Sequence, residues 1–171
     1  MSGLIEDRTD EAALWEDPDI DADVDEELID ELYAASCVGV PIDLVVRGMC
    51  ALRPGVAGLS ENVRVRSILG RFLEHARILR FRNGGEDDFW IGSADLMHRN
   101  LDRRVETLVR VVDPEARRTL DDILERSMSP DIAAWELQPD ASFVANKGTD
   151  IQGELVRSHR TSQSHDAPVV G

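Results

Sequence analysis

Apolar side chains recur at helical spacing in residues 24–38 (VDEELIDELYAASCV), and acidic residues occupy the first turn, where they complement the helix dipole. Gly39 follows this segment as a helix stop. Residues 114–128 begin with a proline and an acid, a combination typical of helix N-termini. With a shorter segment at residues 67–74 (SILGRFLE), the pattern predicts three helices.

Short apolar or alternating segments between these helices are typical of strands: residues 42–46, 63–65, 75–82, 89–95 and 104–112. The first of them, IDLVV, ends at Arg47, whose side chain would emerge at the carboxyl end of a buried strand. Ligand sites of open α/β sheets lie at such strand ends. The succession of helices and strands therefore predicts an α/β fold with Arg47 as a first candidate binding residue.

Charge is distributed unevenly along the 171 residues, whose formal net charge is −15. Residues 1–32 contain fourteen acidic side chains and one basic side chain. We expect residues 1–23 to form a solvated, disordered acidic leader. From Lys147 onward the chain is polar and loses its periodicity, which predicts a flexible polar tail over residues 145–171. One folded domain, residues 24–144, lies between the two.

Composition excludes several classes of protein. The strongly acidic balance argues against a nucleic-acid-binding protein, and no apolar stretch approaches the length of a membrane span. Cys37 and Cys50 are too few for a disulfide scaffold and fit a reducing compartment. The chain also lacks a P-loop motif and any recognisable metal-ligand spacing, so no metal site is predicted in it. We expect a cytoplasmic protein, either free or peripheral at the membrane, without a transmembrane segment.

Residues 47–82 reverse the overall charge, because they contain eight arginines and only two acidic residues. The arginines are Arg47, Arg53, Arg64, Arg66, Arg71, Arg77, Arg80 and Arg82. A planar guanidinium holds phosphate oxygens at two points, whereas a lysine ammonium acts as a point charge. The segment therefore predicts a phosphate-binding surface. Composition alone equally allows solvated surface arginines.

Residues 75–95 are predicted to form a β-hairpin whose turn, residues 83–87, contains two glycines. One register pairs Phe81 with Phe89, Leu79 with Ile91, Arg77 with Ser93 and His75 with Asp95. In that register an imidazole oriented by a carboxylate lies beside an arginine, a group suited to proton or phosphoryl transfer. A shift of one residue would separate these side chains. The alternative is that His75 is an ordinary histidine at the start of a strand.

Four motifs carry a resemblance to a known family. They are RGMCALRPG from Arg47, SENVRVRSI from Ser60, RFLEHAR from Arg71 and SADLMHRNLDRR from Ser93. In this order they resemble the C-terminal catalytic lobe of polyphosphate kinase 1, and the resemblance extends from Val24 to Gln138. It implies a phospholipase D-like α/β lobe with a mixed sheet flanked by helices.

The resemblance also implies an activity and a set of site residues. The family transfers the terminal phosphate of ATP to polyphosphate, reversibly, with Mg²⁺ and through a phosphohistidine. His75 matches the second active-site histidine, which contacts ATP, while Arg47 and Arg104 match phosphate-facing arginines. Comparison with phospholipase D motifs adds Arg77, Ser93 and Asp95. The implied catalytic residues are thus His75 and Asp95, and the implied phosphate-binding residues are Arg47, His75, Arg77, Ser93 and Arg104.

The sequence departs from the family in extent and at single positions. Gly92, Leu96 and Ala51 replace residues expected to be serine, tryptophan and cysteine. The preceding lobe, with the phosphorylated histidine and the arginines of the metal site, does not occur in the sequence, so the implied Mg²⁺ would find its ligands outside this chain. We therefore expect little kinase turnover by the chain alone.

The sequence is compatible with three functions. The chain is one part of a polyphosphate kinase that works beside the missing upstream domains, with ATP, ADP and polyphosphate as its ligands. Alternatively, it is a phospholipase D-like phosphodiesterase whose single motif is completed in a homo-oligomer. The third possibility is a polyphosphate- or nucleotide-binding remnant without catalytic activity.

Overall fold

The computed structural model describes residues 9–16, 26–48, 50–72, 75, 77–93 and 105–165, with side chains for all of these except 9–16 and 161–165. The strands are β1 (Thr9–Glu16), β2 (Ile42–Val46), β3 (Val63–Ser67), β4 (Ile78–Asn83), β5 (Glu86–Gly92), β6 (Leu108–Val111), β7 (Ala134–Leu137) and β8 (Phe143–Asn146). The helices are α1 (Glu26–Cys37), α3 (Pro114–Met128) and α4 (Ile151–His165). This confirms the predicted α/β class, with helices at α1 and α3 and a strand at β2 as the pattern indicated.

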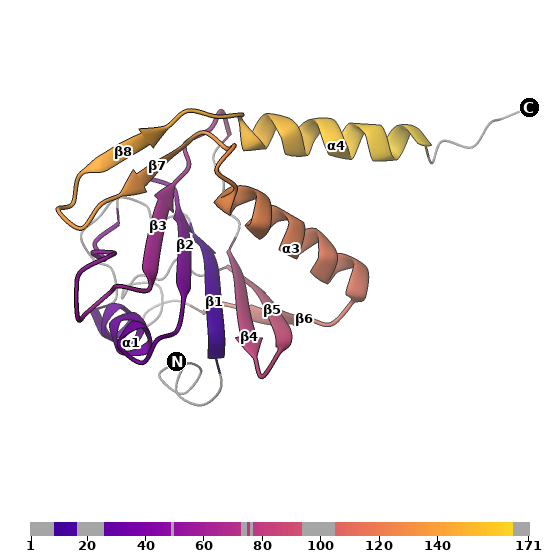
Figure 1. Cartoon of the computed structure of the whole chain (residues 1–171). Coiled ribbons are helices and arrows are strands. Elements are labelled where there is room, and N and C mark those ends of the chain that lie inside the picture. The colour runs from indigo at the N-terminus through magenta and orange to yellow at the C-terminus, as the bar shows by residue number, and fades with distance from the viewer. Residues whose placement is uncertain are drawn as a thin grey trace, which may run out of the picture.

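The strands form one eight-stranded mixed sheet in the order β6-β5-β4-β1-β2-β3-β7-β8 (Figure 1). β1, β2 and β3 are parallel, and β4 pairs antiparallel with β1. β5 and β6 continue the sheet on one side, and β7 and β8 continue it antiparallel on the other. The start of β4 therefore lies at the same end of the sheet as the carboxyl ends of β1, β2 and β3.

The two predicted tails are partly wrong. The acidic composition predicts disorder over residues 1–23, but residues 9–16 form β1 in the middle of the sheet. This segment, TDEAALWE, has an apolar stretch that the flanking acids obscure, and its order comes from backbone pairing with two neighbouring strands. Residues 145–171 are predicted to be flexible, yet β8 ends at Asn146 and α4 occupies residues 151–165. Residues 147–150 connect these two elements, and Thr149 forms an isolated bridge with Ile132. Residues 1–8, 17–23 and 166–171 of the predicted tails lie outside the described residues.

The predicted helix over residues 67–74 is also wrong for the part that the structure describes. Ser67 ends β3, and residues 68–72 form a loop without helical structure. Only Ile68 of this loop is buried, so no apolar face is available to hold a helix against the sheet.

Hydrophobic side chains form a core on each face of the sheet. The first core cluster joins α1 to one face, through Leu32 and Ala35 of the helix and Ile42, Leu44 and Val46 of β2. The second core cluster joins α3 to the opposite face, with Leu124 of the helix and Val45 of β2 among its members. β2 alternates between the two clusters because successive side chains of a strand point to opposite faces. Both faces of the central strands are therefore covered.

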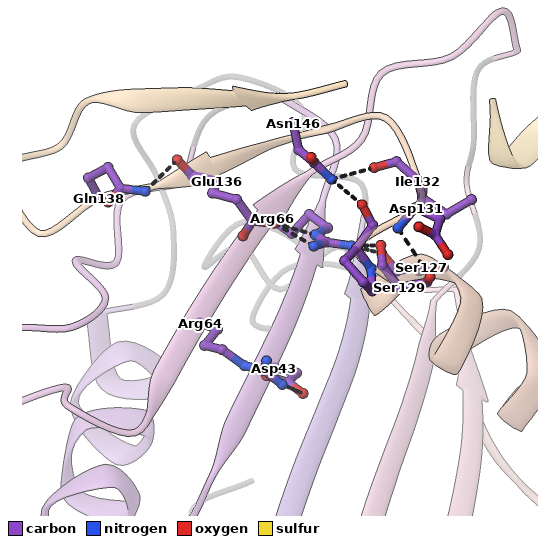
Figure 2. Close-up of polar contacts among 11 residues, drawn as sticks. Asp43, Arg64, Arg66, Ser127, Ser129, Asp131, Ile132, Glu136, Gln138 and Asn146 are labelled. Carbon is purple, nitrogen blue, oxygen red and sulfur yellow. Dashed lines mark hydrogen bonds and ion pairs between the residues drawn. The ribbon is translucent and has the colours of Figure 1, made fainter. Parts of the chain in front are cut away.

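Buried arginines on the α3 face hold this helix and β7 to the sheet. Arg66, 7% exposed, donates from Nε to Glu136 Oε1 at 2.6 Å (Figure 2). Its Nη1 donates to the carbonyl oxygens of Ser127 and Ser129 at 2.9 and 2.5 Å, at the carboxyl end of α3. Arg80 Nη1 pairs with Asp121 and Glu125 of α3, each at 2.7 Å. These arginines of the basic segment are structural, which neither proposed role for the segment anticipated.

The hairpin of β4 and β5 has a register one residue away from the predicted one. Phe81 lies opposite Asp88, and Arg80 lies opposite Phe89. The cause is the turn, which consists of Gly84 and Gly85 alone, both with positive φ (63° and 87°). Two consecutive residues with positive φ close a two-residue hairpin turn, whereas the prediction assigned five residues to the loop. The predicted facing of Arg77 with Ser93 is therefore wrong.

We predict that Arg66→Ala lowers the free energy of unfolding by about 3 kcal/mol or more, the range for breaking a buried ion pair by removing one partner. The substitution leaves Glu136 and two carbonyl oxygens at the end of α3 without the guanidinium that holds them. Urea denaturation followed by circular dichroism measures the change.

Arg64→Ala is the matched control on the neighbouring position of the same face. The Arg64 side chain is 68% exposed and pairs with Asp43 at 2.6 Å (Figure 2). The Asp43 side chain is only 14% exposed, but water reaches the pair from the side of Arg64, so Arg64→Ala should lower the free energy of unfolding by at most about 1 kcal/mol. Equal losses in the two variants would contradict the structural role assigned to Arg66.

Candidate functional site

The pairing of the strands brings several predicted site residues to one end of the sheet. Across the sheet, Glu16 pairs with Val46 and Val46 pairs with Ser67, the last residues of β1, β2 and β3. On the other side of β1, Trp15 pairs with Ile78, the first residue of β4. The residues that follow β2 and precede β4 therefore lie at a common end. We call Arg47, His75, Arg77 and Ser93, which flank the strands here, the candidate site.

Arg47 directly follows β2 and is half-buried. The backbone after it is fixed from β3, because the Gly48 amide donates to Ser67 Oγ at 3.1 Å. Gly48 has φ of 101°, a conformation that favours glycine and turns the chain immediately after Arg47. The end of β2 and this hydrogen bond fix the backbone on both sides of Arg47. Arg47 therefore lies at the carboxyl end of a buried strand, as the sequence predicted.

Arg77 precedes β4 and is buried, with 7% of its surface exposed. Its carbonyl oxygen accepts from the Gly92 amide at 3.0 Å, so Arg77 lies opposite Gly92 rather than Ser93. Glycine suits this position, since a Cβ there would lie 3.2 Å from Leu108 Cδ1 and 3.4 Å from the Thr107 carbonyl oxygen. A guanidinium keeps its charge when buried, which makes Arg77 a fixed positive charge at this end of the sheet. His75, two residues earlier, is exposed.

Ser93 uses its hydroxyl to bind the segment that leads into β6. Ser93 Oγ donates to Glu106 Oε2 at 2.5 Å and accepts from the Thr107 amide at 3.0 Å. The Ser93 amide also donates to the Thr107 carbonyl oxygen at 3.1 Å. The hydroxyl thus joins β5 to the approach to β6 in this structure. The two other predicted site residues, Asp95 and Arg104, lie outside the described residues.

A cavity of about 430 Å³ lies elsewhere, between α3 and the sheet. Its charged lining comprises Asp43, Arg64, Arg80 and Glu125. These side chains already form ion pairs, Arg64 with Asp43 and Arg80 with Glu125. The cavity therefore belongs to the packing of α3 rather than to the candidate site.

Two polar residues that hold backbone beside the candidate site have no recognisable signal in the sequence. Ser67 is an ordinary serine at the end of a strand, and Gln152 lies in the segment predicted to be a tail. Gln152 is buried and hydrogen-bonded to the backbone of Phe72, three residues before His75. Only the pairing of distant segments gives either residue a role.

Within the described ranges, no three His, Cys, Asp or Glu side chains are grouped so that they could hold a metal ion. The Mg²⁺ that the family resemblance implies is therefore assigned no ligands among the described residues. None of the helices in the described ranges is both long enough and apolar enough to cross a bilayer.

Comparison with known proteins identifies the family. The family model described as "Polyphosphate kinase C-terminal domain 2" matches residues 19–155, a range that continues past the predicted boundary at residue 144 into α4. The polyphosphate kinase of Streptomyces coelicolor is 58% identical over 135 residues, which cover 79% of this chain and 18% of the relative. That of Mycobacterium marinum is 55% identical over 147 residues, covering 85% of this chain and 19% of the relative.

A solved structure agrees with these relatives. The crystal structure of polyphosphate kinase from Porphyromonas gingivalis superimposes with a TM-score of 0.81 and 34% sequence identity. The match covers 92% of this chain and 24% of that one, so the chain spans about a quarter of the solved protein and less than a fifth of the two relatives. The four motifs, the mixed α/β fold and these matches agree, and the chain belongs to the polyphosphate kinase family, in which it corresponds to the C-terminal domain.

Proposed function

We propose that this chain binds the phosphates of ATP and polyphosphate at the candidate site and contributes one half of a polyphosphate kinase active site. The observation that carries the proposal is that Arg47, after β2, and His75 and Arg77, before β4, flank the same end of the sheet. The reaction class is phosphoryl transfer: the bond from the γ-phosphorus of ATP to the β,γ-bridging oxygen breaks. A bond from that phosphorus to a terminal polyphosphate oxygen forms over the complete reaction.

The two arginines have the chemistry that a chain of phosphates requires. Each guanidinium offers several N–H donors in a plane, which match two phosphate oxygens at once. Arg77 is buried, so its charge acts through a medium of lower dielectric than water and stabilises an anion more strongly than an exposed charge would. The exposed imidazole of His75, when protonated, can donate a hydrogen bond to a phosphoryl oxygen.

We expect the chain to bind these ligands without completing the reaction alone. The resemblance assigns the phosphorylated histidine to a preceding lobe, which lies outside the segment that the chain shares with its relatives. Groups that act as a unit in catalysis lose almost the whole rate when one member is absent. Binding and turnover are therefore separate tests of the proposal.

Arg47→Ala and Arg77→Ala should each weaken polyphosphate binding by about 1–3 kcal/mol, the range for charge-assisted hydrogen bonds. Arg47→Lys should restore only part of the affinity, because the ammonium cannot hold two oxygens in a plane. Titration calorimetry at low ionic strength measures the change. Arg64→Ala, on the α3 face, is the control arginine and should bind as the parent chain does.

Unchanged affinity in both alanine variants would contradict the proposed site. Arg77 is buried, so circular dichroism must first show that Arg77→Ala is folded. If it is not folded, Arg47→Ala decides the question, since Arg47 is only half-buried and its loss leaves the core clusters intact.

Turnover should appear when the chain is mixed with the upstream part of the Streptomyces coelicolor relative, from which the matched C-terminal segment has been removed. We expect ATP-dependent polyphosphate synthesis by the mixture, none by either part alone, and none when the chain carries His75→Ala. Polyphosphate is measured after removal of nucleotides. Synthesis that is equal with the parent chain and with His75→Ala would contradict the role of His75. Binding of polyphosphate with no synthesis in any mixture would favour a binding protein without catalytic activity.

A further inference from the structure

The side-chain amide of Gln152, in the first turn of α4, holds the backbone of Phe72 at two points. The Phe72 amide donates to Gln152 Oε1 at 2.8 Å, and Gln152 Nε2 donates to the Phe72 carbonyl oxygen at 2.9 Å. Gln152 is only 7% exposed, although 80 residues separate it from Phe72. A buried carboxamide that satisfies both backbone groups of one distant residue is a specific contact rather than a surface one.

The loop that receives this contact has little else to hold it. Residues 68–72 form neither helix nor strand, and Leu69 and Phe72 are 62% and 50% exposed. The backbone at Gly70 lies directly against the amide, since a Cβ there would come within 2.2 Å of Gln152 Oε1. A side chain at position 70 would therefore displace the Gln152 amide from Phe72, and the end of the loop is attached through its backbone.

Gln152 is itself firmly placed. Its neighbour Ile151 is 1% exposed in the second core cluster, and the Gln152 amide donates to Asp150 Oδ1 at 3.1 Å. Just before the helix, the Thr149 amide donates to the Asp131 carbonyl oxygen at 2.7 Å, which ties the start of α4 to the segment after α3. Ile68 holds the start of the loop in the second core cluster, and Gln152 anchors the end of the loop, at Phe72, to the core through one side chain.

This anchor lies next to the candidate site in the chain. His75 is three residues after Phe72, and an extended segment of three residues spans at most about 10 Å. The position of Phe72 therefore limits where His75 can lie. We propose that Gln152 is a positioning residue for His75, acting through the backbone of residues 68–72. The inference rests on the proposed function, because it assigns Gln152 to the phosphate site that contains His75.

Two variants separate the hydrogen bonds of Gln152 from its packing. Gln152→Met keeps a side chain of similar length and removes both hydrogen bonds. Gln152→Glu keeps the shape, but the ionised carboxylate has no donor for the Phe72 carbonyl oxygen. When protonated, the carboxyl group accepts and donates as the amide does, and burial raises the pKa of such a group. The effect of Gln152→Glu should therefore diminish as the pH falls.

The full chain is tested by amide hydrogen exchange and by titration with inorganic polyphosphate. In Gln152→Met the Phe72 amide should exchange at least about fivefold faster, the factor that one lost hydrogen bond supplies. Polyphosphate affinity should fall by a similar factor. In a His75→Ala background the same substitution should have no further effect on affinity, because Gln152 acts through His75. The polyphosphate affinity of Gln152→Glu, compared with that of the parent chain at the same pH, should recover as the pH is lowered.

Ser158→Ala, on an exposed turn of the same helix, is the matched control and should change neither quantity. Unchanged exchange of the Phe72 amide in Gln152→Met overturns the inference. If His75→Ala weakens polyphosphate binding, then faster exchange in Gln152→Met with unchanged polyphosphate affinity also overturns it. Additive losses in the double variant also overturn it, because they indicate a general structural role. If His75→Ala alone leaves affinity unchanged, the proposed role of His75 fails first, and the inference fails with it.

Discussion

The backbone hydrogen bonds of β1 join the two halves of the sheet, and the candidate site depends on this junction. β2, β3, β7 and β8 lie on one side of β1, while β4, β5 and β6 lie on the other. Arg47 comes from the first half and Arg77 from the second. They lie at the same end because β1 runs parallel to β2 and antiparallel to β4. An acidic segment thus organises a site built from basic residues, through its main chain.

Four of the eight arginines of residues 47–82 fall into two groups according to their position on the sheet. Arg66 and Arg80 point to the α3 face, where the carboxylates of β7 and α3 neutralise them and the pairs hold the layers together. Arg47 and Arg77 flank the strand ends, where a mixed sheet of this kind binds its ligands. The same guanidinium chemistry suits the ion pairs and the proposed phosphate contacts, since its planar N–H groups match carboxylate and phosphate oxygens alike.

The loops of the candidate site are held by polar side chains from elsewhere in the fold. Ser67 holds the backbone after Arg47, and Gln152 holds the loop before His75. Phosphoryl transfer depends on positioning charged groups with little reorganisation, so such backbone attachments matter as much as the charged groups themselves. The start of α4 is part of the family domain, since the family match extends to residue 155.

Features that depend on residues close together in the chain could be predicted before the structure was known. Helical periodicity was enough to predict α1, and a proline followed by an acid at its N-terminus was enough to predict α3. The apolar run after Pro41 was enough to predict β2. The motifs around Arg47 and His75 indicated the family, because their residue order is specific enough to be recognised from the sequence alone.

Tertiary structure decided the rest. The strand at residues 9–16, the one-residue shift of the hairpin, the ion pairs of Arg66 and Arg80, and the contact of Gln152 with Phe72 each depend on partners distant in the sequence or on the turn that sets a register. A local pattern reports only the charge and hydropathy of a segment. It cannot report which backbone or side chain the folded chain will bring against that segment.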